Sequence, residues 1–160
     1  MRHNVRVDQH SDTERFLDIG ASVRVVIVKL SRQLNVSAAH ERLTPTEASV
    51  LGIIAFRGPI SLSQLAGIEA LNPTMVSRVV GKLDDRGLVR RVPNEHDLRS
   101  VTVEITREGA EVNERIRAER ARTVAESMAS ISPEHREAIV AAIPALDALA
   151  DDLIVRRASR

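Results

Sequence analysis

The chain has 160 residues, 28% of them charged, with a formal net charge of only +1 at neutral pH, and this length predicts one domain with a core large enough to fold without disulfides or structural metals. It contains no Cys, Trp or Tyr, which excludes disulfides, thiolate metal sites and Cys nucleophiles and argues against aromatic stacking platforms for single-stranded nucleic acid. No segment reaches the roughly 18 apolar residues of a membrane span, and the polar N-terminus lacks the apolar core of a signal peptide, so a cytoplasmic protein without membrane contact is expected.

The first predicted element is a long helix over residues 13–36. Apolar residues recur in steps of three and four from Phe16 through Val23 to Leu34, which is the spacing of one helical face. Additional valines widen this face, so the helix is expected to be buried on more than one side. Residues 1–12 show no such pattern and are expected to be frayed.

A second helix begins with a clear start signal. Thr44 can cap its N-terminus, Pro45 suits the first helical position, and Glu47 completes a capping box. Gly58 followed by Pro59 predicts its end, because glycine favours the C-terminal cap and proline cannot continue the helix.

Two further helices follow within a short span. The segment 62–69 predicts a short helix that starts from a second capping box, formed by Ser61 and Gln64. After a tight polar turn, the next helix is capped by Asn72 and closed by Gly87. Aliphatic residues occupy one face of this helix, and the other face carries Thr74, Met75, Ser77, Arg78, Gly81 and Lys82.

Beyond Gly87 the apolar period changes from about 3.6 to 2. The runs LVRRV (residues 88–92) and VTVEI (101–105) predict two strands of a hairpin. Pro93 is expected to end the first strand, which leaves residues 94–100 as a polar tip. Arg99 lies in this tip, at the end of the hairpin, where a cation can enter the electronegative minor groove of DNA. Asp97 can brace it, although an ordinary surface ion pair explains the two residues equally well.

Two more helices are predicted over residues 107–130 and from Ser132 onward, with Thr106 as a cap and Pro144 as the cause of a kink. Together with the first helix they carry more apolar surface than one small lobe needs. That favours a twofold homodimer, the commonest oligomer, with packing inside one chain as the alternative.

The predicted fold is therefore mainly α with a small two- to three-stranded antiparallel β wing. It comprises an N-terminal helical part (residues 1–40), a winged helix-turn-helix lobe (41–107) and C-terminal helices (108–160). In such a lobe the second helix of the helix-turn-helix enters the major groove. The predicted DNA-binding residues are Ser61, Gln64, Thr74, Met75, Ser77, Arg78, Lys82 and Arg99.

Four runs stand in a fixed order and spacing: Pro73-Thr74-Met75-Val76-Ser77-Arg78, Leu83 to Val89, Asp97-Leu98-Arg99, and Ile105-Thr106 with Gly109. Together they resemble the MarR (multiple antibiotic resistance regulator) family of winged-helix transcription regulators, and the resemblance extends over residues 13–156. It implies a homodimer in which the N-terminal dimerisation helix (residues 1–40) and the C-terminal dimerisation helices (108–160) are intertwined as one domain with the lobe. This dimer is expected to bind a pseudo-palindromic double-stranded DNA operator, usually as a repressor of its own or a neighbouring operon. The resemblance also implies that Arg99 is the minor-groove residue of the wing and Asp97 its orienting partner. Leu98 departs from the Arg or Lys frequent at its position, which removes one positive charge from the wing.

The resemblance further implies release by a small aromatic or phenolic effector, bound between the dimer helices and the lobe. Arg24, His40 and Arg57 are the candidate polar anchors for it. The branch of the family that senses oxidants through Cys is excluded by composition. Zinc is disfavoured because the five His residues form no close-spaced pair, so no metal and no cofactor are expected.

Two other classes of function are alternatives to a DNA-binding regulator. One is a winged helix that binds protein rather than DNA, but the polar face with Thr74, Ser77 and Arg78 favours DNA, since a protein interface should carry apolar anchors. The other is an enzyme. No nucleophile-base pair, Gly-rich phosphate loop or metal cluster is visible, and no enzymatic activity is predicted.

Overall fold

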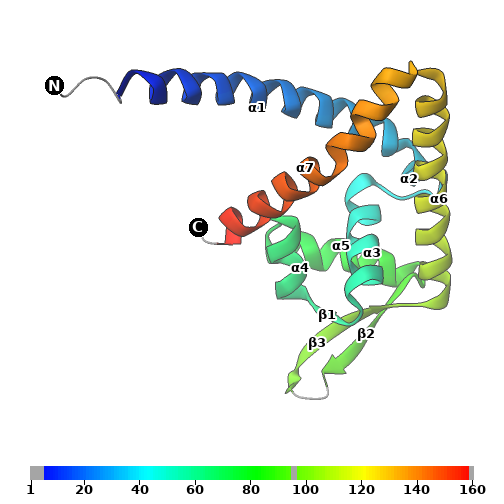
Figure 1. Cartoon of the computed structure of the whole chain (residues 1–160). Coiled ribbons are helices and arrows are strands. Elements are labelled where there is room, and N and C mark those ends of the chain that lie inside the picture. Colours follow the sequence, from blue (N-terminus) through cyan, green and yellow to red (C-terminus); the bar gives the residue numbers. More distant parts are fainter. Residues whose placement is uncertain (1–5, 95–96, 159–160) are drawn as a thin grey trace. The chain divides into compact units, whose positions relative to one another are not determined.

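The computed structural model describes residues 6–94 and 97–158, without the side chains of residues 6–11, 94, 97–100 and 157–158. These residues belong to two compact units, of which the first ends at Val36 and the second begins at Ser37. The elements are labelled in Figure 1.

The first unit is formed by the long helix α1 (Arg6–Leu34). The expectation of fraying up to residue 12 is wrong from Arg6 onward. That expectation rested on the lack of an apolar face, but a polar segment without Gly or Pro can continue a helix through its backbone hydrogen bonds alone. The apolar face itself is exposed to solvent, with Phe16 68% and Leu30 57% exposed.

A five-residue helix, α2 (Val36–His40), spans the boundary between the two units, and the sequence did not predict it. The winged lobe follows: α3 (Pro45–Arg57), α4 (Leu62–Glu69) and α5 (Pro73–Asp85), with three strands. Each helix starts at the predicted cap residue. Thr44 and Ser61 both close capping boxes in which their hydroxyls accept a backbone hydrogen bond, from Glu47 and Gln64 respectively.

The three strands form one antiparallel sheet in the order β1-β3-β2. The strands are β1 (Ile60–Ser61), β2 (Val89–Asn94) and β3 (Asp97–Ile105). The short strand β1 pairs Ile60 with Val103 and so fixes the base of the wing against the helices. The predicted mainly α fold with a small antiparallel wing is confirmed.

The predicted hairpin tip is too long. Strand β2 continues through Pro93, which pairs with Val101, and β3 already begins at Asp97. Proline has no N–H to donate, but β2 is an edge strand, where a missing donor costs no ladder hydrogen bond. A register irregularity follows directly between Pro93 and Asn94. Of the predicted tip, Glu95 and His96 lie outside the described residues.

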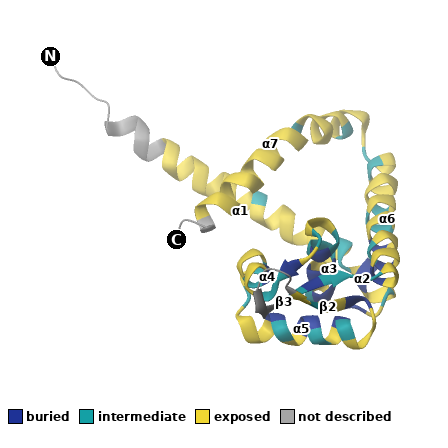
Figure 2. Cartoon of the chain, turned by 90° about the horizontal axis from the view of Figure 1, so that it is seen from below, coloured by how far each residue is buried: buried dark blue, intermediate teal, exposed yellow. Residues whose placement is uncertain are grey.

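The core lies between the three lobe helices, the sheet and the start of α6 (Arg107–Ser130). Figure 2 shows the buried residues gathered in these elements, while most of α7 (Pro133–Ala158) is drawn as exposed. No residue whose side chain is described in α1 or α7 is buried. Helix α7 continues on both sides of Pro144. The largest fully buried side chains are Val50, Leu51, Ile54, Leu65, Val76, Val80, Leu83, Leu88, Val89 and Val103.

Candidate nucleic-acid interface

Helix α5 divides its side chains cleanly between core and solvent. Its start is fixed by Asn72, whose Oδ1 accepts a hydrogen bond from the Met75 N–H at 2.8 Å. The aliphatic residues Val76, Val79, Val80 and Leu83 are buried, as predicted. On the opposite side Thr74, Met75, Arg78 and Lys82 are exposed and Ser77 is half-buried. Five predicted contact residues thus share one outward face, and their contact with DNA stays a prediction.

A shallow cavity lies between α4 and α5, on the outward side of the helix-turn-helix. It has a volume of about 670 Å³ and is lined by Leu62, Ser63, Pro73, Thr74, Ser77 and Arg78. The sequence named three of these residues as contacts. The cavity brings them next to the start of α4, so both helices of the motif contribute to the same concave surface.

Ser61 and Gln64, also predicted as DNA contacts, are already engaged in starting α4. The Ser61 N–H donates to Gln64 Oε1 at 3.0 Å, and the Ser61 hydroxyl donates to the same oxygen at 2.9 Å. The Gln64 N–H donates back to the Ser61 hydroxyl oxygen. The side-chain nitrogen Nε2 of Gln64 takes part in none of these three bonds. It is therefore the group of this pair with most freedom to reach a phosphate.

Lys82 has a partner within the lobe. Its Nζ lies 3.3 Å from Oε1 of Glu47, which is almost completely buried. Burial alone would raise the pKa of Glu47, but hydrogen bonds from Thr44 and Lys82 outweigh it and hold that pKa below its ordinary value. The charge of Lys82 therefore stabilises the Glu47 carboxylate inside the lobe. Its predicted contact with the DNA backbone stays a prediction.

The wing carries arginines at its base that bind acidic residues. Arg90 pairs with Glu104 across the two strands. Arg91 Nε lies 3.6 Å from Asp84 Oδ2, which links the wing to the end of α5. The backbones of Asp97 and Arg99 belong to β3, but their side chains are outside the described residues, so the predicted brace between them stays a prediction.

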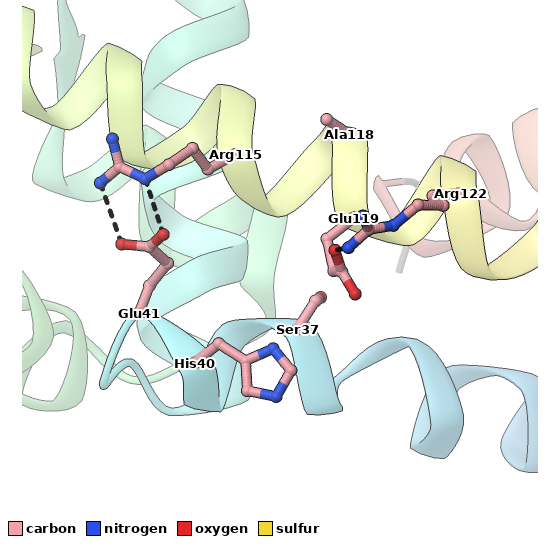
Figure 3. A pocket seen from close by; sticks show the side chains of 7 residues that line it. All are labelled: Ser37, His40, Glu41, Arg115, Ala118, Glu119 and Arg122. Carbon is pink, nitrogen blue, oxygen red and sulfur yellow. Dashed lines mark hydrogen bonds and ion pairs between the residues drawn. The ribbon is translucent and has the colours of Figure 1, made fainter.

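Two of the three candidate effector anchors, His40 and Arg57, line different cavities. His40 lines a cavity of about 360 Å³ between α2 and α6, shown in Figure 3. Arg57 lines a different cavity of about 790 Å³ between α3 and α6, with Phe56, Ile53, Arg117 and Arg120. Arg24 belongs to α1 in the first unit. The role of each of the three residues in binding an effector stays a prediction.

The contacts of Arg86, Glu41 and Arg115 were not predicted from the sequence. Arg86 follows α5 and donates to the backbone of the turn before α3, 44 residues away along the chain. Glu41 in that turn accepts two hydrogen bonds from Arg115 on α6. No local pattern signals such long-range contacts.

Among the described residues, no group of three metal-binding side chains is arranged around a common point. None of the described helices combines the length and apolar character needed to cross a membrane.

The comparison with known proteins agrees with this geometry. Residues 43–101 match the model of the MarR family. An uncharacterized HTH-type transcriptional regulator of Mycobacterium bovis is 28% identical over 134 residues, which cover 84% of this chain and 94% of that protein. Similar relatives are described as HTH-type transcriptional regulators.

Solved structures share the fold at low identity. A MarR family protein of Bacillus stearothermophilus superposes with a TM-score of 0.75 at 20% identity, covering 88% of this chain and 96% of the other. A mutant of MepR from S. aureus, bound to an oligodeoxyribonucleotide, gives a TM-score of 0.62 at 15% identity, covering 84% and 97%.

Proposed function

The chain belongs to the MarR family of DNA-binding transcriptional regulators, and from that premise we propose that it acts as a homodimer that binds a pseudo-palindromic double-stranded operator. We propose further that it represses its own or a neighbouring operon until a small aromatic or phenolic anion releases it.

The observation that carries the proposal is the outward face of α5. A helix of 13 residues is about 20 Å long, and its polar face is narrow enough to lie in the major groove. Thr74, Ser77 and Arg78 lie at its N-terminal end, from which recognition helices reach base edges. Arg78 can donate two hydrogen bonds to one guanine, and the half-exposed Met75 offers an apolar contact to a thymine methyl group.

The homodimer is supported by the apolar residues of α1 and α7. In each helix, considered by itself, large aliphatic side chains are exposed to solvent, including Ile143 (56%) and Leu153 (58%) of α7. Large apolar side chains exposed in such number on one helix are typical of an interaction surface. A second copy of the chain is the partner with a matching surface, and a twofold axis would place two α5 helices on one side of the molecule.

The repressor function is tested by selecting duplexes from randomised DNA and from the DNA flanking the gene. We expect an inverted repeat with half-sites about one helical turn apart. Binding should weaken steeply with salt, because Lys and Arg side chains release counterions from phosphates. Failure to select any duplex, or binding that ignores salt, would contradict the proposal. Transcription from the selected promoter in vitro then distinguishes repression from activation.

The cavity of about 790 Å³ between α3 and α6 is the better candidate for the effector. It combines the apolar side chains of Ile53, Phe56 and Ile105 with the cations Arg57 and Arg117, a lining that suits an aromatic ring bearing a carboxylate. We expect a hydroxybenzoate to release the operator duplex and Arg57→Ala to reduce this response. If the variant responds as the wild type does, the effector binds elsewhere.

A further inference from the structure

The C-terminal end of the recognition helix α5 is tied to the turn that precedes α3. Arg86, the residue after α5, donates from Nη1 to the carbonyl oxygen of Arg42 at 2.7 Å. Its Nη2 donates to the carbonyl oxygen of Glu41 at 2.9 Å. The two bonds come from one planar guanidinium and reach two successive peptide groups, so they fix the orientation of the turn as well as its distance.

The same turn is held from the other side by α6. Arg115 donates from Nε to Glu41 Oε1 at 2.7 Å and from Nη2 to Oε2 at 3.0 Å, the paired bonds drawn in Figure 3. These hydrogen bonds hold the pKa of Glu41 below its ordinary value, against the opposing effect of burial. Glu41 therefore stays ionised near neutral pH and connects the turn to α6.

The turn itself is a defined piece of structure. Arg42 has a φ of 55°, in the left-handed region. The N–H groups of Arg42 and Leu43 donate to the carbonyl oxygens of Ala39 and Ala38, both at 2.9 Å. Leu43 and Ala38 are buried in the core. A turn with this many fixed groups transmits a displacement from one side to the other instead of absorbing it.

Arg86 is far from the residues that read bases. It lies 12 positions after Thr74, which is about 18 Å along a helix axis. Lys82, one turn before Arg86, also binds the segment around the start of α3, through Glu47. Lys82 and Arg86, near the C-terminal end of α5, thus both bind the segment of residues 41–47. The polar residues at the start of α5 remain exposed.

We propose that Arg86, Glu41 and Arg115 form a positioning cluster that fixes the recognition helix relative to α6. Arg86 acts through the turn and does not contact DNA. The inference rests on the proposed function, because in a homodimer the position of α5 relative to the dimerisation helices decides which half-site spacing the two recognition helices fit. Loss of Arg86 should therefore impair the choice of spacing more than the reading of each half-site.

The first experiment measures the cluster without DNA. Because the chain has no cysteine, Thr74→Cys and Ala121→Cys place one spin label on α5 and one on α6, and dilution with unlabelled protein isolates the distance within one chain. We expect a narrow distance distribution, which Arg86→Ala broadens or shifts. Arg107→Ala is the matched control, since it also removes a cation and that cation pairs along α6 with Glu111. Identical distributions for Arg86→Ala and the unmutated chain would overturn the proposal.

The second experiment uses the duplex selected by the unmutated chain, with its half-sites moved apart or together by one base pair. Arg86→Ala should bind the best spacing about three- to thirty-fold more weakly and discriminate less between spacings. The dependence of affinity on salt should not change, because no phosphate contact is lost. A salt dependence reduced by about one phosphate contact would show that Arg86 binds DNA directly, and the proposal would be wrong.

Two further variants separate positioning from folding. Glu41→Gln and Arg115→Ala should reproduce the loss of spacing preference, and each combined with Arg86→Ala should add little, since all three groups act as one unit. If Arg86→Ala does not fold, Arg86→Lys keeps the charge and one donor and should give an intermediate distance distribution. If the unmutated chain selects no duplex, the proposed function fails, while the distance measurement still decides on the cluster.

Discussion

At the residue scale, the basic side chains of the lobe fall into two groups. Arg86, Arg90 and Lys82 bind acidic or carbonyl oxygens within the protein. The guanidinium of Arg78 faces outward, and Arg99 follows the β2–β3 connection in the wing. The near-zero net charge of the chain conceals this division, because affinity for DNA depends on the few cations that are free to meet phosphates or bases.

Arg99→Ala tests the wing. We expect operator affinity to fall by about 1–3 kcal/mol, because a cation is lost from the minor groove, with little change in the melting temperature. Arg90→Ala is the control in the same wing, since Arg90 is paired with Glu104 and its loss should affect binding less. Fluorescence anisotropy with a labelled duplex measures both. An unchanged affinity for Arg99→Ala would remove the wing from the mechanism.

Glu47 makes stability depend on acid pH. Its pKa in the folded protein is lowered, since hydrogen bonds from Thr44 and Lys82 outweigh burial. A lowered folded-state pKa means that the carboxylate stabilises the fold fully above the unfolded-state pKa of about 4.3, and that this contribution disappears as pH falls through the folded-state value.

The matched variant is Glu47→Gln, which keeps an amide oxygen for the Thr44 N–H, as Gln64 does for Ser61. Urea unfolding at pH 7 should show a loss of about 0.5–1 kcal/mol, and the difference from the unmutated chain should shrink below about pH 4.3. A difference that persists at acid pH would assign the effect to packing and not to charge.

At the element scale, the first turn of α6 is packed against Leu88, directly before strand β2, more closely than any side chain at Gly109 allows. A Cβ built on Gly109 would lie 1.9 Å from the carbonyl oxygen of Leu88. That carbonyl also accepts a hydrogen bond from the Thr106 N–H at 3.1 Å. The glycine is therefore required by the close approach of α6 to the chain entering the wing, and its backbone conformation is ordinary.

Gly109→Ala should destabilise the fold by about 3 kcal/mol, because backbone atoms must move to admit one methyl group. Gly67→Ala is the control within α4, where a Cβ meets nothing within 4 Å. That substitution should stabilise by up to about 1 kcal/mol. Thermal unfolding compares the two variants. Equal melting temperatures would mean that α6 can shift away from Leu88 at little cost.

Elements with local signals were predictable and elements set by distant contacts were not. The starts of α3, α4 and α5 are each set by a cap residue and its neighbours within four positions along the chain. Thr44, Ser61 and Asn72 were therefore enough to predict where these helices begin. Helix α2 was absorbed into the longer helical pattern. Strand β2 extends past Pro93 because it lies at the edge of the sheet, and strand order depends on pairings that one segment does not contain.

The candidate interface shows the same division. The outward position of Thr74, Met75 and Arg78 follows from helical period, because burial of Val76 and Val80 dictates it. The partner of Lys82 does not follow from any spacing, since Glu47 lies in another helix. The Arg86 contacts are likewise invisible in the sequence, because carbonyl acceptors are present at every residue.

At the scale of the whole molecule, a single chain leaves many large apolar side chains of α1 and of α7 exposed to solvent, each helix considered within its own unit. Aliphatic side chains in the second half of α7, such as Leu146, Leu149 and Ile154, are 41–66% exposed. The sequence predicted these faces as buried, and the structure of one chain exposes them. The proposed association of two chains would resolve the difference, because it would remove this apolar area from water.

Leu149→Glu tests this association. A carboxylate placed in an apolar interface must be desolvated without a partner, which costs several kcal/mol per chain, and a twofold interface contains the substitution twice. Light scattering after size exclusion should therefore show monomers or unfolded protein where the unmutated chain shows dimers, and operator binding should fall with the dimer. Arg107→Glu, at a 95% exposed side chain on the lobe, introduces the same group and should remain dimeric. A stable Leu149→Glu dimer would mean that the interface is formed by other faces of α1 and α7, and the equivalent substitution at Phe16 would then be the next to examine.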